Sequence, residues 1–259
     1  MSGVRLAAGL ALLAAAVSHP TPASEGRPLS LRVSVATSLA PAIREAVDRY
    51  PSVKPEVEVQ LSSGASGVLL QQVRRGAPVD LLISASPDEI DRLVAARLAL
   101  GPTRRRIAAN RLVVVVPSGA AKPATLEELA RPDFDLIALG SPKTAPVGRY
   151  ARDALRAHGL WQRLEARHVL AASARQVLEY VARGDVAAGL AYRTDALLLP
   201  DRVTIALEVP IASHAPIFYE GVVIVDAAQP EAATAFLDWL GTESGRAPLV
   251  RRGFLIPRQ

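Results

Sequence analysis

Four short stretches of the chain combine small residues and serine in a pattern that suits the binding of an anion. They are 35–38, 63–67, 145–148 and 172–175, and each joins a predicted strand to a predicted helix. The first turn of a helix exposes unpaired N–H donors at the positive end of the helix dipole. Four such helix starts around one point would surround a small anion with donors. The pattern therefore indicates that an anion is bound and not chemically transformed.

The sequence lacks the usual groups of an enzyme active site. Ser66 lies in Gly-Ala-Ser-Gly-Val, which lacks the second glycine of a nucleophile elbow, and no nearby motif supplies a histidine base. The histidines His19, His158, His168 and His214 share no metal-ligand spacing. No glycine-rich segment matches a P-loop or a dinucleotide fingerprint. We therefore expect no enzyme activity, no cofactor and no metal site of the protein's own.

The bulk composition argues against thiol chemistry and against nucleic acid as a partner. The 259-residue chain has a formal net charge of +5 and no cysteine. Its basic residues are interleaved with acids, and the cluster at 104–106 lacks the aromatic neighbours of a nucleic-acid patch. Aromatic residues make up 4% of the chain, which is too few for stacking platforms on single strands. We expect the cluster at 104–106 to lie in a solvated loop or at a hinge edge.

The first residues have the pattern of a secretory signal. Arg5 is followed by an apolar stretch of 12 residues at 6–17, and small residues and prolines follow at 20–24. This stretch is shorter than the roughly 20 residues that a permanent membrane-spanning helix needs. We therefore expect residues 1–23 to be a signal peptide, cleaved after Ala23, and the mature chain to be exported.

Strands and helices alternate along the rest of the chain, which is typical of the α/β class. The predicted strands are 31–35, 57–61, 80–85, 112–116, 136–139, 168–170, 187–192 and 222–225. The predicted helices are 39–50, 69–75, one opened by 87–89, 126–130, 149–158, 173–183 and 231–240. Ser173 and Gln176 have the spacing of a capping box at the start of one helix, and Gly184 ends it.

The repetition of this pattern predicts two lobes instead of one sheet. Open α/β sheets bind ligands at the carboxyl ends of their strands, so two facing lobes would place the four turns around one cleft. We expect the C-terminal segment to return to the first lobe, with 222–225 paired to 112–116 as the hinge. The predicted first lobe is 24–111 plus 220–259, and the predicted second lobe is 112–219.

Six segments, in order along the chain, resemble the periplasmic molybdate-binding proteins of ABC importers. They are Val-Ala-Thr-Ser-Leu at 35–39, Ser-Gly-Ala-Ser-Gly at 63–67, Gly-Ala-Pro-Val-Asp-Leu-Leu-Ile-Ser-Ala at 76–85, Asn-Arg-Leu-Val-Val-Val-Val-Pro at 110–117, Ala-Pro-Val-Gly-Arg-Tyr-Ala at 145–151 and Gly-Leu-Ala-Tyr-Arg-Thr-Asp-Ala at 189–196. The resemblance implies a two-lobed periplasmic-binding-protein fold of type II and a periplasmic location. It also implies molybdate or tungstate as the ligand and the membrane permease of an ABC importer as the partner. We expect a monomer that binds no nucleic acid.

In this family two serine side chains, backbone N–H groups and one tyrosine hold the anion. The resemblance assigns these roles to Ser38 and Ser66, to the amides of Val147 and Ala174, and to Tyr192. Because a proline has no N–H, the amide of Val147 is the first donor in its turn. Each residue also has an ordinary structural alternative. The two serines could be helix N-cap residues, and the two amides could be ordinary first-turn amides of their helices. The tyrosine could be a half-buried packing residue.

The chain departs from the family pattern at three points. It has Ser141-Pro142 before the third turn where the family often has Asp-Pro or Asn-Pro, Thr37 where it often has Ala, and Arg193 where Gly or Ser commonly follows the tyrosine. These departures bear on selectivity more than on the fold. Three alternatives stay open: a binding protein for sulfate or another oxyanion, a secreted enzyme acting on a phospho- or sulfo-ester, and a regulatory effector-binding module.

Overall fold

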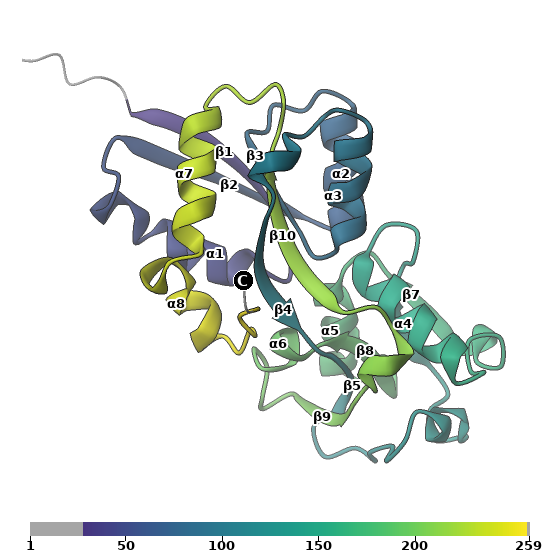
Figure 1. Cartoon of the computed structure of the whole chain (residues 1–259). Helices are drawn as coiled ribbons and strands as arrows, with labels where there is room; N and C mark the ends of the chain where they lie inside the picture. Colours follow the sequence, from purple (N-terminus) through teal and green to yellow (C-terminus); the bar gives the residue numbers. More distant parts are fainter. Residues whose placement is uncertain (1–27, 258–259) are drawn as a thin grey trace, which may run out of the picture.

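The computed structural model describes residues 28–257, so the predicted signal peptide at 1–23 and His19 lie outside the described residues. Within this range the chain forms two α/β lobes, each built on a five-stranded sheet (Figure 1). No helix between residues 28 and 257 is long and apolar enough to cross a membrane.

The first lobe is built on a mixed sheet with the strand order β2-β1-β3-β10-β4. Its strands are β1 (Leu29–Ala36), β2 (Val57–Gly64), β3 (Leu81–Ser84), β4 (Arg105–Asn110) and β10 (Ile217–Val223). β1 runs parallel to β2 and β3, whereas β10 runs antiparallel to β3 and β4. The helices of this lobe are α1 (Ala40–Val47), α2 (Ser66–Arg74), α3 (Pro87–Ala95), α7 (Pro230–Leu240) and α8 (Glu243–Arg251), with short 3₁₀ helices η1 (Tyr50–Ser52) and η2 (Gly101–Thr103).

The second lobe repeats this plan with the strand order β7-β6-β8-β5-β9. Its strands are β5 (Leu112–Pro117), β6 (Ile137–Gly140), β7 (His168–Ala171), β8 (Ala188–Tyr192) and β9 (Val203–Glu208). β6 runs parallel to β7 and β8, and β5 runs antiparallel to β8 and β9. The helices are α4 (Pro146–Ala157), α5 (Ala174–Arg183) and α6 (Arg193–Ala196), with 3₁₀ helices η3 (Glu127–Ala130), η4 (Glu165–Arg167) and η5 (Ile211–Ser213).

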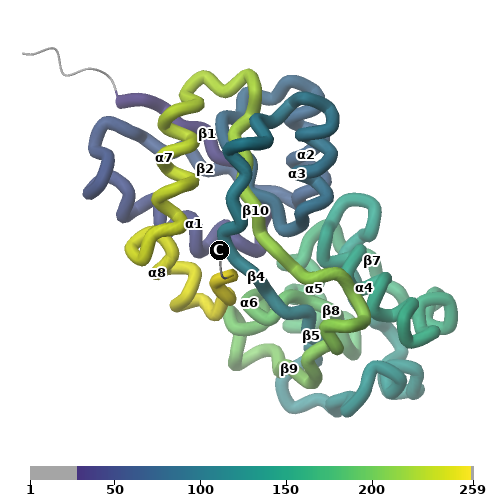
Figure 2. Tube along the Cα trace, viewed as in Figure 1, coloured from purple at the N-terminus to yellow at the C-terminus, as the bar shows by residue number. Residues whose placement is uncertain are grey.

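The chain passes between the lobes twice. It leaves the first lobe at Arg111, between β4 and β5, and it returns in the segment between β9 and β10 (Figure 2). The helices α7 and α8 then pack on the first lobe, where α8 lies against α1. The predicted two-lobed α/β fold and the return of the C-terminal segment to the first lobe are thereby confirmed.

The expected pairing of 222–225 with 112–116 was wrong. β10 pairs with β3 and β4, and β5 pairs with β8 and β9. Residues 112–116 are apolar throughout and completely buried, so they occupy an inner position of the second sheet and not an exposed hinge ribbon. β10 also spans the predicted lobe boundary at 219–220, and the lobe limits themselves stay a prediction.

The arginine cluster at 104–106 does not form a solvated loop. Arg105 opens β4 and its Nε lies 2.8 Å from Asp238, while the guanidinium of Arg106 stacks 3.7 Å above the ring of Phe218. Arg104 precedes the strand and pairs with Glu220 at 2.5 Å. Carboxylates on α7 and β10 compensate these charges locally, which allows a basic run to begin a strand.

Candidate functional site

The five predicted site residues line one cavity between the lobes. The ends of β1, β2, β3 and β8 and the starts of α1, α2, α4 and α5 surround it. None of the residues that line it carries a formal charge. Its volume is about 20 Å³, whereas one water molecule needs roughly 10–15 Å³. The lobes therefore lie closed around a small, enclosed space.

Four backbone N–H groups at this cavity have no hydrogen-bond partner between residues 28 and 257. They belong to Ser38, Ser66, Val147 and Ala174. Each lies at or just before the first turn of a helix, where no preceding carbonyl is within reach. Several neighbouring amides are paired: the N–H of Thr37 donates to the carbonyl of Gly64, and the N–H of Gly148 donates to the carbonyl of Ala145, each at 3.0 Å. The unpaired donors thus concentrate where the helix dipoles favour negative charge.

The serine hydroxyls add two donors to the same space. Ser66 Oγ accepts a hydrogen bond from the N–H of Ala85 at 3.0 Å, so its own hydrogen stays available. Ser38 Oγ lies 2.9 Å from the hydroxyl of Tyr219, which also accepts from Asn110 Nδ2 at 3.2 Å. With an acceptor role already taken, the Tyr219 hydroxyl can give its hydrogen to Ser38. Ser38 then keeps its own hydrogen for a ligand.

The orientation of Asn110 fixes the direction of this chain of hydrogen bonds. Its Oδ1 accepts from the N–H of Arg111 at 2.9 Å, and its Nδ2 also donates to Thr194 Oγ1 at 2.8 Å. Asn110 lies at the end of β4, where the chain leaves the first lobe. Asn110 therefore sets the direction in which the Ser38 hydroxyl donates. Asn110 lies where the chain first crosses between the lobes, and it contacts Thr194 of the second lobe.

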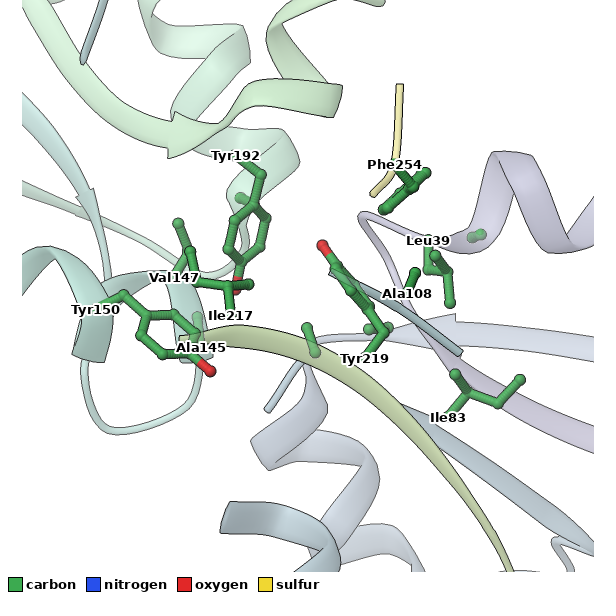
Figure 3. Packing of buried hydrophobic residues seen from close by; sticks show 14 of the residues in the cluster. Leu39, Ile83, Ala108, Ala145, Val147, Tyr150, Tyr192, Ile217, Tyr219 and Phe254 are labelled. Carbon is green, nitrogen blue, oxygen red and sulfur yellow. The ribbon is translucent and has the colours of Figure 1, made fainter. Parts of the chain in front are cut away.

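Tyr192 supplies a further donor. The residue is 1% exposed, and its hydroxyl has no hydrogen-bond partner between residues 28 and 257. Burial raises the pKa of the Tyr192 hydroxyl well above its ordinary value, so the group is protonated and donates. Its ring stands edge-on to the ring of Tyr219, with 6.0 Å between centroids, and Val147 lies beside it (Figure 3). Burying a hydroxyl without a partner costs free energy, so the Tyr192 hydroxyl suits a contact with an acceptor atom of a ligand.

The two serines do not cap their helices, contrary to the structural alternative considered for them. The N-cap positions of α1 and α2 belong to Leu39 and Ala65, and neither helix has a side-chain capping bond. The Oγ atoms of Ser38 and Ser66 are engaged with Tyr219 and with an amide after β3 instead. By contrast, the capping box predicted for α5 is confirmed in its main bond, since Ser173 Oγ accepts from the N–H of Gln176 at 3.2 Å.

A close backbone approach positions the donor of Val147. A Cβ atom at Gly148 would lie 2.0 Å from the carbonyl oxygen of Gly140, so only glycine allows α4 to begin against the end of β6. The helix starts at Pro146, whose missing N–H leaves the amide of Val147 as the first donor of the turn. The sequence Ala-Pro-Val-Gly therefore places one backbone donor with little freedom to move.

Charged residues lie near the cavity without lining it. Asp195, at the start of the second lobe's α6, is 1% exposed, and its Oδ2 has no partner among residues 28–257. Burial raises the pKa of Asp195 to about 7, while Arg175 lowers it. Arg193 is directed away from the cavity, with its Nη1 next to Gly253. In the same range no group of three His, Cys, Asp or Glu residues could hold a metal ion.

Comparison with known proteins identifies the family. The profile of a family described as bacterial extracellular solute-binding protein matches residues 31–255. The chain belongs to this family. This solute-binding protein is 31% identical over 251 residues to the molybdate-binding protein ModA of Escherichia coli, with 95% of each chain covered. It is 30% identical over 244 residues to the putative ABC transporter substrate-binding lipoprotein YvgL of Bacillus subtilis, covering 94% of this chain and 93% of that one.

Solved structures agree with this assignment. The periplasmic molybdate-binding protein of Azotobacter vinelandii aligns with this solute-binding protein at a TM-score of 0.76 and 25% identity, over 88% of this chain and all of that chain (100%). The sulfate-binding protein SubI of Mycobacterium tuberculosis shares the fold at a TM-score of 0.74 and 18% identity, over 87% of this chain and 86% of that one. The predicted type II fold and the family resemblance inferred from the six segments are therefore confirmed.

Proposed function

We propose that this solute-binding protein captures molybdate, or tungstate, between its lobes and delivers it to the membrane permease of an ABC importer. We further propose that it is exported to the periplasm by a cleaved signal peptide and works there as a monomer, without enzymatic activity and without binding nucleic acid. Its relationship to proteins named as molybdate-binding supports the choice of ligand.

The observation that carries this proposal is the set of donors without partners around an uncharged cavity. They are four amides, two serine hydroxyls and one tyrosine hydroxyl, seven in all, and they belong to Ser38, Ser66, Val147, Ala174 and Tyr192. A buried dianion is very costly unless it is surrounded by hydrogen-bond donors. Each charge-assisted bond contributes roughly 1.5–3 kcal/mol, so seven of them can offset the loss of hydration.

The same lining argues against the enzyme alternative. An enzyme that hydrolyses a phospho- or sulfo-ester needs a base, a nucleophile or a metal beside the anion. The cavity residues are alanines, serines, a glycine, a threonine, a proline, a valine and a tyrosine. Ser66 is held by a backbone amide and not by a base. Sulfate stays a competing ligand, because it is also a fully deprotonated tetrahedral dianion.

Calorimetric titration with molybdate, tungstate and sulfate tests the proposal, and a competition with phosphate sharpens it. At pH 7 phosphate carries a proton and therefore needs an acceptor, which a ring of donors lacks. Turning a hydroxyl to accept that proton costs roughly 1–3 kcal/mol. We expect one tight site for molybdate that a large excess of phosphate does not empty. Displacement by phosphate at comparable concentration contradicts the donor-only site, and tighter binding of sulfate assigns the protein to sulfate.

A further inference from the structure

A buried ion pair joins the two lobes beside the cavity. Arg149 lies in the first turns of α4, in the second lobe, and its Nη2 is 2.5 Å from Oε1 of Glu89 in the first turn of α3, in the first lobe. The side chain of Glu89 is completely buried, and that of Arg149 is 13% exposed. Neither residue lines the cavity. The pair therefore links the lobes without being part of the proposed ligand set.

Further contacts between the lobes lie on the same rim. The N–H of Gly67, at the start of α2, donates to the carbonyl of Thr144 in the second lobe at 3.0 Å. A Cβ atom at Gly67 would lie 2.6 Å from that carbonyl oxygen, so the two backbones are in direct contact. Figure 1 shows α2 and α3 facing α4 and β7 across the gap between the lobes. The ion pair is thus the charged element of a contact that forms only when the lobes are closed.

Separation of the lobes removes the counter-charge of Glu89. Its other oxygen, Oε2, is left with a single weak contact to Ser84 Oγ at 3.4 Å. Arg149 loses Asp88 as well, because Asp88 also lies in the first turn of α3; this weaker contact joins Nε to Oδ2 at 3.8 Å, and the Asp88 side chain is 60% exposed. In an open protein water replaces both partners, whereas in the closed protein the pair is short and mostly dry. A change that removes one partner therefore penalises the closed state, where the other charge is left buried, more than the open state.

We propose that Glu89 and Arg149 form an interlobe latch that determines how long the closed protein retains its anion. The proposal rests on the function proposed above. Because Arg149 follows Val147 by two residues on the same helix start, closure brings the pair together as the second lobe presents its donor to the anion. A ligand that closes the lobes gains from the pair, and a ligand can only leave after the pair separates. The latch thus acts on dissociation more than on the contacts with the anion.

Distance measurements between spin labels test the latch. The chain has no cysteine, so Val68→Cys on α2 and Leu170→Cys on β7 give one labelled site in each lobe. Both positions are exposed, at 42% and 55%. Without ligand, we expect Glu89→Gln and Arg149→Gln to shift the distance distribution towards longer separations than in the parent. With saturating molybdate all variants return to the short separation.

The rate at which radiolabelled molybdate leaves the protein is the second readout. We expect each single variant to release it about tenfold faster or more, and the double variant to release it more slowly than the product of the two effects predicts. Asp88→Asn is the matched control, since it removes the exposed neighbour, and it should leave both readouts unchanged. If Glu89→Gln does not fold, Arg149→Gln carries the test alone.

Two results separate the latch from the proposed function. Distances and release rates like those of the parent in both single variants overturn the latch, even when molybdate binds tightly. A parent protein that binds no molybdate overturns the proposed function, while the distances measured without ligand still decide whether Glu89 and Arg149 hold the lobes closed.

Discussion

The substitution Tyr192→Phe distinguishes a ligand from a packing residue, because only a ligand loses affinity for the anion when its hydroxyl is removed. In the protein without ligand the Tyr192 hydroxyl has no partner among residues 28–257, and the side chain is 1% exposed. Removing the oxygen breaks no hydrogen bond and keeps the edge-on contact with Tyr219. We therefore expect the variant to be at least as stable as the parent.

The magnitudes follow from the cost of burying a hydroxyl without a partner. Leaving such a group unsatisfied costs roughly 1–3 kcal/mol, so its removal stabilises the unliganded protein by up to that amount. A gain of about 1 kcal/mol raises the Tm of a chain of this size by roughly 2–4 °C. In the complex the variant loses a hydrogen bond to a buried dianion. A loss of roughly 1.5–3 kcal/mol weakens molybdate binding about 10- to 150-fold.

Thermal unfolding without ligand and calorimetric titration with molybdate measure both effects on one preparation. Tyr219→Phe is the control, because it removes a hydroxyl that contacts Ser38 and accepts from Asn110, and it should lower the Tm. A Tyr192→Phe variant with the affinity of the parent refutes the assignment of Tyr192 as a ligand. A variant that gains stability and keeps its affinity identifies a packing residue instead.

Three further predictions concern the donors and their surroundings. Ser38→Ala and Ser66→Ala should each weaken molybdate binding by roughly 1.5–3 kcal/mol in calorimetry, and equal affinity of both variants and the parent places the anion elsewhere. Ser66→Ala should also lower the free energy of unfolding by about 1–3 kcal/mol, because the amide that donates to its Oγ loses its acceptor. Gly148→Ala should lower the Tm and the affinity together, since its Cβ meets a backbone oxygen of β6 at 2.0 Å, and an unchanged Tm contradicts this close approach. Burial raises the pKa of Asp195 to about 7, so between about pH 4 and pH 7 the folded state holds a proton that the unfolded state releases. Asp195 therefore makes the free energy of unfolding fall as the pH rises through this range. Asp195→Asn should remove this part of the pH dependence in thermal melts, and an unchanged profile contradicts the prediction.

The order of the elements and their convergence could be predicted from the sequence because both follow from local patterns. Alternating strands and helices, small-residue turns and a capping box at Ser173 are properties of short segments. The rule that ligands bind at the carboxyl ends of strands then brings distant turns together. All five residues proposed as ligands, including Val147 and Ala174, line one cavity for that reason.

Features that depend on pairing across long separations could not be predicted in this way. β4 was not predicted because it begins with two charged residues, Arg105 and Arg106, which suggest a solvated loop. Their partners Asp238 and Glu220 lie more than a hundred residues further along the chain. β9, α6 and α8 were also missed. The role of Ser38 as a helix cap is excluded because α1 starts later, with Leu39 as its N-cap residue, and because the Ser38 hydroxyl contacts Tyr219 of β10.

The ion pair between Glu89 and Arg149 could not be predicted from the sequence either. In the sequence, Glu89 belonged only to the predicted helix start at 87–89, and Arg149 only to the predicted helix 149–158 and to the family segment at 145–151. Their contact depends on the relative placement of the two lobes, which no local pattern encodes.

The central claim is that donors of both lobes, without any counter-charge, hold a molybdate dianion. A crystal structure of the protein grown with molybdate tests it most directly, because the anomalous signal of molybdenum locates the ion independently of the protein atoms. We predict a single molybdenum peak in the cavity between the lobes. Its oxygen atoms should lie within hydrogen-bond distance of the amides of Ser38, Ser66, Val147 and Ala174 and of the Tyr192 hydroxyl. A molybdenum peak confined to one lobe, or one next to a lysine or arginine side chain, would contradict the account.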